Sequence, residues 1–177
     1  TIPENVEYVC SSAFNNCHIT IFSLSKKVFN LKNDDAVIVN PDIPPENYIR
    51  KINAVKGFLL YPDKYKGEIA ESYKKAFLRN RSNLLPFVFK HDLVRAVAIL
   101  AESGKITAEN YETQYLACMQ RANAVKSAAY LLDWVNANIT EEQREKAFEK
   151  QLEEDPNNPA DMRKLWKYEE KEDGIHI

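Results

Sequence analysis

Two stretches of the chain decide the fold that we expect. They are residues 84–104, LLPFVFKHDLVRAVAILAESG, and residues 115–136, YLACMQRANAVKSAAYLLDWVN. Each contains two short apolar segments with helical spacing, separated by a polar turn, which predicts a helical hairpin. A single shift aligns their apolar positions: Leu93 with Val125, Ala96 with Ala128, Val97 with Ala129, Ile99 with Leu131 and Leu100 with Leu132.

An Ile-Thr step follows each hairpin, at Ile106-Thr107 and again at Ile139-Thr140. Paired short helices with a period of about 33 residues are typical of ankyrin-type repeats, although the Thr-Pro-Leu-His motif of those repeats is absent. One hairpin cannot bury its apolar face alone, so stacked hairpins share a continuous core. The predicted fold class is therefore mainly α: stacked antiparallel helical hairpins, an ankyrin-like α-solenoid in shape, with a short β-rich N-terminal segment.

Upstream of the hairpins, two further helices are predicted. Pro45 suits the first turn of a helix, and Ile49, Ile52 and Val55 follow it at helical spacing as a buried face. The second helix covers residues 68–80. We expect this part of the chain to form an irregular cap on the first hairpin.

Polar side chains that can accept hydrogen bonds from free backbone N–H groups mark the other expected helix starts. They are Ser82 or Asn83, Asp92, Thr107 and the capping box formed by Thr140 and Gln143. The capping box opens a charged and largely exposed helix over residues 140–154, with Phe148 and Leu152 as anchors. Asn158 is expected to cap a last short helix, residues 159–166, and Asp173-Gly174 indicates a hairpin turn near the end of the sequence.

Residues 1–40 have strand character instead. Ile19, Ile21 and Leu24 alternate with polar residues, and residues 36–39 predict another short strand. Three prolines between positions 41 and 45 then form a stiff connection that no helix or central strand can run through. The predicted organisation is a leucine-rich-repeat-like end over 1–40, a helical-hairpin domain over 45–154, and a C-terminal helix with the start of a further β segment over 155–177.

The composition excludes several classes of protein. Of 177 residues, 45% are hydrophobic and 28% are charged, which is ordinary for a soluble globular protein. The net charge of -2 and the lack of a clustered basic excess argue against nucleic-acid binding. No apolar run approaches the roughly 20 residues of a membrane span, and no signal-peptide pattern opens the sequence. Four glycines cannot build a phosphate-cradling loop.

The residues that could carry chemistry do not form a recognisable pattern. Cys10, Cys17 and Cys118 are interpreted as buried free thiols, and a Cys10–Cys17 disulfide stays open only for a secreted protein. His18, His91 and His176 lie outside helical reach of one another, and His91 is interpreted as a surface or capping residue. We therefore predict no catalytic residue, no metal ligand and no cofactor.

Charged and aromatic clusters have structural interpretations. The carboxylates of residues 141–154 and 169–173 are interpreted as solvated faces, with a paired-carboxylate hydrolytic site as the alternative. Lys74, Lys75, Arg79 and Arg81 form a basic cluster, which is interpreted as a solvated helix end, with an anion or nucleic-acid patch as the alternative. The aromatic residues expected in the core, a minority of them exposed on a binding face, are Tyr65, Tyr73, Phe77, Phe87 and Phe89.

Residues 1–22 resemble one turn of the BspA-type bacterial leucine-rich repeat. The residues that carry the resemblance are Ile2-Pro3-Glu4-Asn5-Val6, Val9, Ser12-Ala13-Phe14, Cys17 and Ile19. In that family the Ile-Pro and Val positions line the core of the solenoid, and Ala-Phe fills it. Residues 168–177 resemble the strand that opens a further block of such repeats. Residues 109–111 and 129–133 resemble ankyrin-like hairpins that lie between such blocks. The resemblance implies protein or glycan binding and a cell-surface or secreted setting.

These observations leave three hypotheses about function. The first is a non-enzymatic scaffold that binds a protein partner or a surface ligand within a larger leucine-rich-repeat protein, and it predicts a partly apolar exposed groove. The second is a structural spacer between repeat blocks. The third is a small hydrolase with a non-local site, which requires His91 or Cys118 in a cleft beside an acidic partner.

Overall fold

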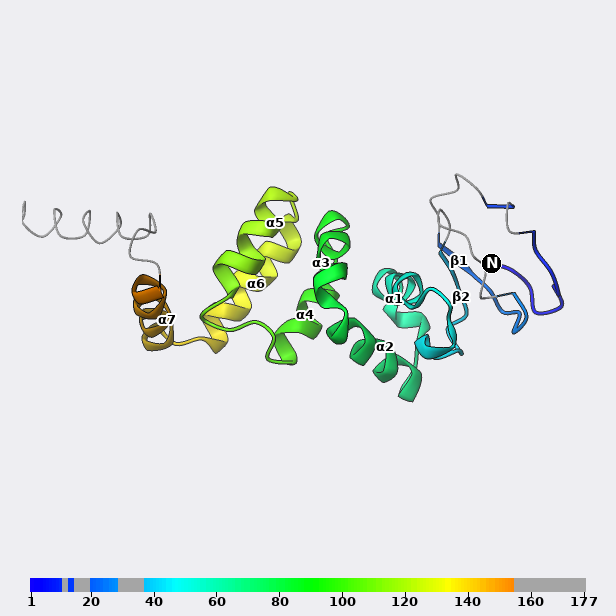
Figure 1. The fold of residues 1–177 in the computed structure, drawn as a ribbon, viewed down its shortest axis with the longest axis horizontal. Coiled ribbons are helices and arrows are strands. Elements are labelled where there is room, and N and C mark those ends of the chain that lie inside the picture. Colours follow the sequence, from blue (N-terminus) through cyan, green and yellow to red (C-terminus); the bar gives the residue numbers. More distant parts are fainter. Residues whose placement is uncertain (11–12, 15–19, 29–36, 155–177) are drawn as a thin grey trace, which may run out of the picture.

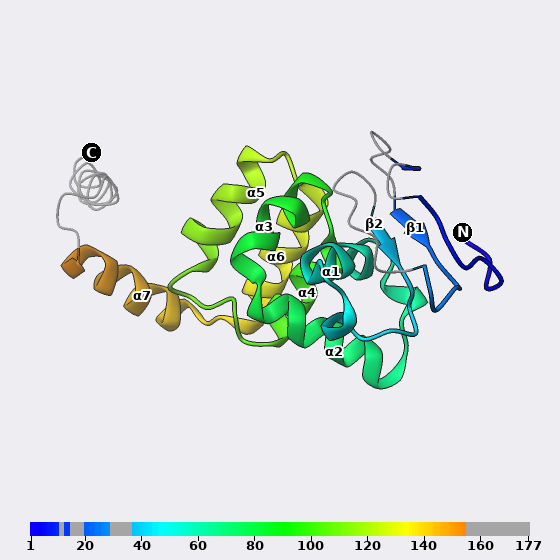
Figure 2. The same ribbon diagram turned by 45° about the vertical axis from the view of Figure 1, so that its right-hand side comes forward.

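The computed structural model of the chain describes residues 1–10, 13–14, 20–28 and 37–154, and within them the protein is mainly helical, as predicted. Two short strands lie at one end of the molecule and helix α7 at the other, with the remaining helices following between them (Figure 1). Figure 2 shows the same order of elements from a second side. The predicted helix at 159–166 and the predicted turn at Asp173-Gly174 lie outside the described residues.

The strands are parallel and very short. Strand β1, Thr20–Phe22, pairs with β2, Val37–Val39, and the second strand was predicted within residues 36–39. Ile2 adds a third parallel contact, because its N–H donates to Phe22 O at 2.7 Å and its carbonyl accepts from Leu24 N–H at 2.9 Å. Their apolar side chains form a small cluster made of Ile2, Ile21 and Val28, with Val6, Val9 and Phe14 packed against it. Leu24, expected on the apolar face, is exposed.

The proline-rich segment joins the strands to the helices through specific contacts. The Tyr48 hydroxyl accepts a hydrogen bond from Asn40 N–H at 2.7 Å and donates one to Asn40 O at 3.0 Å. The Tyr73 hydroxyl donates to Ile43 O at 3.0 Å. Burial raises the pKa of Tyr48 and Tyr73, so both phenols stay protonated as donors near neutral pH. Two tyrosines from the helical part therefore fix the path of residues 40–43.

Strand β2 also packs directly on helix α1, Lys51–Leu60. A Cβ atom added to Gly57 would lie 2.8 Å from Val39 Cγ1, which is closer than side chains tolerate. Glycine is therefore required for this close approach. The predicted helix start at Pro45 was wrong: residues 45–47 form one 3-10 turn, and Tyr48 is extended, so that α1 begins at Lys51. Ile49, expected to be buried, is 61% exposed because it lies in this interruption.

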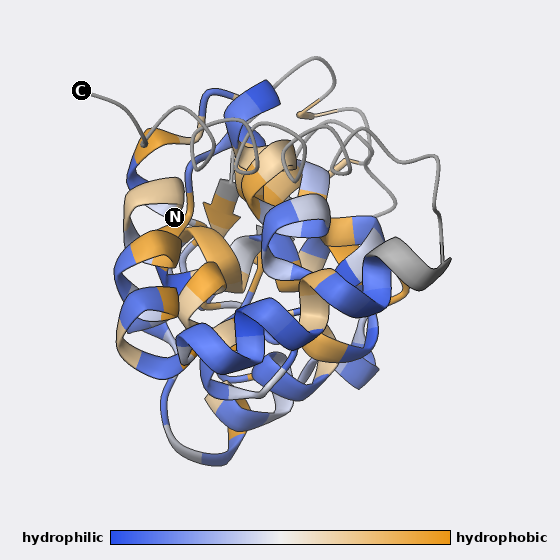
Figure 3. Cartoon of the chain, turned by 90° about the vertical axis from the view of Figure 1, so that its left-hand side faces the viewer, coloured by the Kyte–Doolittle hydropathy of each residue, from blue (hydrophilic) through white to orange (hydrophobic). Residues whose placement is uncertain are grey.

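The remaining helices agree with the predicted order. They are α2 (Gly67–Arg79), α3 (Arg81–Lys90), α4 (Val94–Glu102), α5 (Ala117–Arg121), α6 (Val125–Asn138) and α7 (Glu141–Glu154). A π-helical segment, Tyr111–Leu116, runs directly into α5. The helices carry hydrophobic and hydrophilic residues side by side, as amphipathic packing requires (Figure 3).

Several predicted helix starts were wrong in detail. Ser82 and Asn83 do not cap α3, because that helix begins at Arg81 immediately after α2 and carries Pro86 in its interior. Thr107 does not cap the next helix; its N–H donates to Asn110 Oδ1 at 2.9 Å in a turn that precedes the π-helical segment. Gly104 ends α4 as predicted, with φ +68° and its N–H bonded to Ala101 O.

The turns of the two hairpins repeat in a register that differs by one position from the predicted alignment. Asp92 and Asn123 are the equivalent residues, and both have positive φ, 49° and 56°. In each turn, the N–H of the following residue donates to the carbonyl five residues before it: Leu93 N–H to Val88 O, and Ala124 N–H to Met119 O. Leu93 therefore matches Ala124 and not Val125. The apolar pattern favoured the wrong register, because a shift of 31 residues places Ala96 on Ser127 and Ile99 on Tyr130, whereas the predicted shift of 32 places both on aliphatic residues.

Helix α6 is capped at both ends by charged residues from outside it. At its N-terminus, Asp92 Oδ2 accepts from Lys126 N–H at 3.0 Å and Asp92 Oδ1 from Ser127 N–H at 2.7 Å. At its C-terminus, the Arg144 guanidinium donates to Val135 O at 3.4 Å and to Ile139 O at 3.2 Å. Each charge matches the end of the helix dipole that it faces. The prediction that Asp92 caps α4 was wrong, since its carboxylate serves the second hairpin.

Helix α7 begins with the predicted capping box. Thr140 N–H donates to Gln143 Oε1 at 2.9 Å, and Gln143 N–H donates to Thr140 Oγ1 at 3.3 Å. Among the side chains of this helix that the structure describes, Ala147 is buried, and Phe148, one predicted anchor, is half-buried. The side chain of Leu152, the other predicted anchor, is outside the description. One hydrophobic core extends from Val39 to Ile139 and connects the strand end to the hairpins.

Candidate interaction groove

Two of the residues considered for a catalytic site, His91 and Cys118, lie in the part of the chain that the structure describes. His91 is exposed at the C-terminal end of α3, where its ring centroid lies 4.5 Å from that of Phe87. Cys118 is half-buried on α5 and packs against the main core. Cys10 is exposed, so the expectation of a buried thiol was wrong there. His18, Cys17, His176 and the acidic residues 169–173 lie outside the described residues.

Among the described residues, two acidic side chains of α7 lie beside basic neighbours. On α7, Glu142 pairs with Lys146 at 2.7 Å, and Glu141 lies 3.9 Å from Arg144. No three His, Cys, Asp or Glu side chains in the described ranges come close enough together to bind a metal ion. The aromatic residues expected in the core are buried at Tyr65, Tyr73, Phe77 and Phe89, whereas Phe87 is half-exposed.

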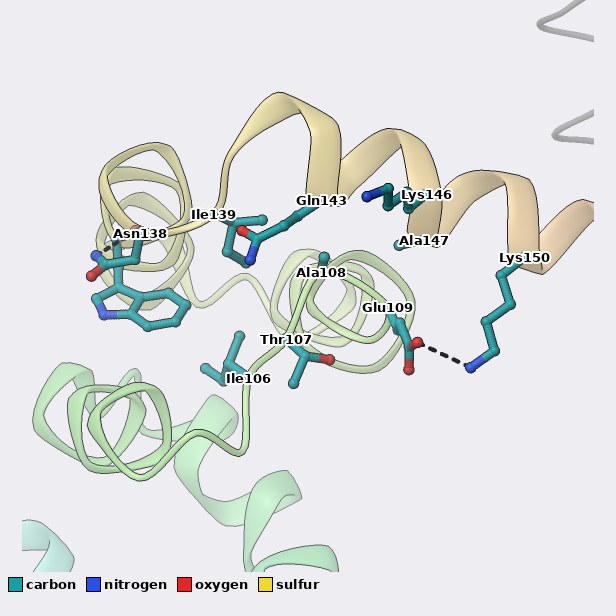
Figure 4. Close-up of a pocket in the computed structure, with 11 residues that line it drawn as sticks. Ile106, Thr107, Ala108, Glu109, Asn138, Ile139, Gln143, Lys146, Ala147 and Lys150 are labelled. Atoms are coloured by element: carbon teal, nitrogen blue, oxygen red, sulfur yellow. Dashed lines mark hydrogen bonds and ion pairs between the residues drawn. The ribbon is translucent and has the colours of Figure 1, made fainter.

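One hollow of the described surface lies where α6, α7 and the segment after α4 meet, and we call it the α6–α7 groove. Its volume is about 620 Å³. Its lining residues are Ile106, Thr107, Ala108, Glu109, Trp134, Asn138, Ile139, Gln143, Lys146, Ala147 and Lys150 (Figure 4). Ile106 and Ile139 come from the two Ile-Thr steps, so the repeated step in the sequence was a signal for this place.

The groove combines an apolar floor with a charged rim. Ile106, Ile139 and Ala147 are buried, and Trp134 is half-buried. At the rim, Lys150 Nζ lies 3.0 Å from Glu109 Oε1 (Figure 4). Gln151 Nε2 donates to Glu109 O at 3.0 Å. These contacts join α7 to the segment opposite it. The groove can accept an apolar side chain below and polar or charged groups above, as protein-interaction sites do.

Part of the predicted basic cluster lines a second hollow, of about 460 Å³. Lys75, Arg79 and Arg81 meet Lys105 and Ser103 there. Lys74 belongs elsewhere, because it pairs with Glu71 at 2.7 Å. Arg81 also approaches Tyr115, whose pKa is raised by burial although the guanidinium opposes that rise. Sequence reasoning found three of these cations but missed Lys105, which follows the next turn of the chain.

No protein-family model, curated protein or solved structure matches the chain. None of the described helices is both long and apolar enough to cross a membrane. The groove and the basic hollow must therefore be interpreted from their own chemistry.

Proposed function

We propose that the chain is a non-enzymatic repeat scaffold that binds a protein partner or a surface ligand as part of a larger leucine-rich-repeat protein. The observation that carries the proposal is the recurrence of one hairpin turn, at Asp92 and again at Asn123, with helices α4 and α6 packed on each other. Successive hairpins that share one core build an extended surface, and repeat proteins use such surfaces to bind partners.

The strand end supports the leucine-rich-repeat part of the proposal. Ile2 pairs with Ser23, and Phe22 pairs with Val39, all in parallel. Parallel strands of a few residues that recur after about 20 residues are typical of that repeat class. Val6, Val9 and Phe14, which carry the resemblance in the sequence, pack against the same small apolar cluster.

The α6–α7 groove is the place where we expect the partner. It is open, its floor is apolar, and its rim offers Lys146 and Glu109 for polar contacts. Thr107 is exposed and lines the groove, so an arginine at this position would fill it with little effect on the core. Gln120 is exposed on α5 away from the groove and provides the matched control.

The test compares three forms of the chain. Proteins captured by the unmodified chain are identified, and the affinity of a purified partner is measured for the chain, for Thr107→Arg and for Gln120→Arg by calorimetry. A partner of the groove loses affinity about tenfold or more with Thr107→Arg and keeps it with Gln120→Arg. A partner that binds all three forms equally would remove the groove from the proposal.

A structural spacer is the second candidate, and the junction between strands and helices favours it. The contacts of Tyr48 with Asn40 and of Val39 with Gly57 make that junction stiff, as a spacer that sets the distance between two blocks requires. The two functions differ in the capture experiment. If the chain is only a spacer, the capture experiment recovers no protein that binds the chain saturably.

A further inference from the structure

Cationic side chains gather at the second hollow, which we call the basic hollow. They come from α2, from the first residue of α3 and from the turn after α4, so three separate parts of the sequence bring positive charge to one place. None of the described lining residues is acidic, although the whole chain carries a net charge of -2. The lining residues are Lys75, Leu78, Arg79, Arg81, Ser103 and Lys105.

The four cations of the basic hollow form no ion pair with a carboxylate of the described residues. Lys74, one residue before Lys75, does pair with Glu71 at 2.7 Å. Glu102 ends α4 but lies close to Tyr130 on α6, whose pKa is raised by burial and then by that carboxylate. Within the described part of the chain, the positive charge of the hollow is therefore not compensated by an acidic side chain.

Capping of the neighbouring helix ends does not account for these charges. At the end of α2, Asn80 N–H donates to two carbonyls of the last turn, and the Arg81 guanidinium donates to Leu78 O at 3.3 Å. At the end of α4, the Ser103 hydroxyl donates to Leu100 O at 2.9 Å, and backbone N–H groups bond its neighbours. A cation near a helix C-terminus is favourable, but hydrogen-bonded capping uses only one donor of Arg81.

Tyr115 holds two parts of the hollow in place. Its hydroxyl donates to Lys105 O at 3.3 Å, and Lys105 O also accepts from Asn110 Nδ2 at 3.0 Å. Arg81, which is half-buried, approaches the same hydroxyl, because burial raises the pKa of Tyr115 and the guanidinium opposes that rise. The backbone of Lys105 and the guanidinium of Arg81 are thus positioned before a ligand binds, which lowers the entropic cost of binding.

The lining favours a polypeptide with several carboxylates as the ligand. None of the residues that the structure places in the lining is aromatic, so the hollow offers no surface on which nucleic-acid bases could stack. Leu78, the apolar residue of the described lining, is half-buried and unsuited to insertion into a lipid surface. Small-molecule sites have mostly apolar walls, which this hollow lacks. Arginine matches the two oxygens of a carboxylate, and lysine adds a point charge.

We propose that the basic hollow binds an acidic segment of a partner protein, whose carboxylates pair with Lys75, Arg79, Arg81 and Lys105. The inference rests on the proposed scaffold function, because the ligand belongs to a partner, and it adds a second contact surface to the α6–α7 groove. Charge complementarity at the basic hollow orients the partner and speeds its association, while the groove supplies apolar contact.

Binding of a fluorescein-labelled oligoglutamate peptide to the full chain, followed by fluorescence anisotropy, tests the assignment. Arg79→Glu and Lys105→Glu are compared with the unmodified chain and with Arg121→Glu. Arg121 is the matched control, because Arg79 and Arg121 are both exposed arginines in the last turn of a helix and Arg121 does not line the hollow.

We expect saturable binding that weakens as salt is raised. It should weaken about fivefold or more in Arg79→Glu and in Lys105→Glu, since each change replaces an attractive charge pair with a repulsive one, and by less than about twofold in Arg121→Glu. Arg79→Gln and Arg121→Gln repeat the comparison without placing a negative charge at a helix C-terminus, and a smaller loss is expected in Arg79→Gln alone.

Three results would overturn the proposal. The first is the absence of saturable oligoglutamate binding at low salt. The second is an equal loss of affinity in the Arg79 and Arg121 variants while circular dichroism shows their helices intact, because net charge would then explain the binding. The third is tighter binding of an oligothymidylate or of phosphatidylserine vesicles than of the peptide. The groove is tested separately by Thr107→Arg, so these results leave the proposed function standing.

Discussion

Removing the carboxylate of Asp92 should destabilise the second hairpin, although Asp92 belongs to the turn of the first. Its two oxygens accept the N–H groups of Lys126 and Ser127 at 3.0 and 2.7 Å, which are the groups that a capping side chain at Ala124 would otherwise satisfy. Losing an N-cap side chain costs about 1 kcal/mol, and losing a favourable charge at a helix N-terminus costs about 0.5 kcal/mol more. We therefore expect Asp92→Ala to lose about 1–2 kcal/mol through the cap.

The positive φ of Asp92 adds a second cost in alanine, and the chain offers a control for it. Asn123 has the same conformation, φ 56° against 49°, in the equivalent turn. Asn123→Ala therefore loses stability only through the left-handed backbone, about 1 kcal/mol. The difference between the two variants, measured by urea unfolding followed by circular dichroism, isolates the cap. Asp92→Asn keeps a residue that tolerates this conformation and is expected to lose about 0.5–1 kcal/mol.

Amide exchange and pH give two further readings of the same contact. The amides of Lys126 and Ser127 should exchange faster in Asp92→Ala and not in Asn123→Ala. Burial raises the pKa of Asp92, but the hydrogen bonds from Ser127 and Lys126 outweigh it and leave the pKa below its ordinary value. The carboxylate therefore stabilises the fold above the unfolded-state pKa of about 4, and this contribution is lost as the pH falls through the lowered pKa. Equal destabilisation by Asp92→Ala and Asn123→Ala, with unchanged exchange, would refute the role of Asp92.

Three further sets of substitutions test separate contacts, each by urea unfolding. Gly57→Ala should lower the free energy of unfolding by about 1 kcal/mol, because the clash with Val39 outweighs the gain in helix propensity. The double variant with Val39→Ala should lose less stability than the sum of the two single losses. Strictly additive losses would argue against the clash. Tyr65→Phe should leave stability unchanged or raise it, because the buried Tyr65 hydroxyl has no hydrogen-bond partner among the described residues. Tyr48→Phe loses two hydrogen bonds and should lower the free energy of unfolding by about 1 kcal/mol. Equal losses of stability in the two variants would contradict this contrast. Arg144→Ala should cost about 1 kcal/mol and speed exchange near the end of α6, and a change below roughly 0.3 kcal/mol, the scale of an ordinary surface substitution, would contradict its capping role.

The features that sequence reasoning predicted correctly are local. The capping box of Thr140 and Gln143 and the stop at Gly104 each depend on residues within one turn of each other, and both occur as predicted. Helix order and most helix bounds follow from apolar spacing over short windows. Even the candidate groove had a local signal in the Ile-Thr steps that supply Ile106 and Ile139.

The features that were missed depend on contacts between distant residues. Asp92 has the right chemistry to cap the helix that follows it, but the turn directs its carboxylate to the second helix of the next hairpin. Ile49 fits an amphipathic pattern, but Tyr48 turns inward to Asn40 and interrupts the helix before it starts. Lys105 joins the basic hollow because the end of α4 lies close to the start of α3. A sequence pattern holds no information about which elements meet in this way.

Exchange of the Ser23 amide tests most directly whether the strands and the hairpins form one scaffold. Ser23 N–H donates to Val39 O at 2.8 Å, and Val39 packs on Gly57 of α1. If the two parts form one unit, Gly57→Ala displaces β2 and the Ser23 amide exchanges several times faster. If the strands are an independent end joined by a passive linker, exchange in α1 changes while the Ser23 amide keeps its original rate, and that result would contradict the account.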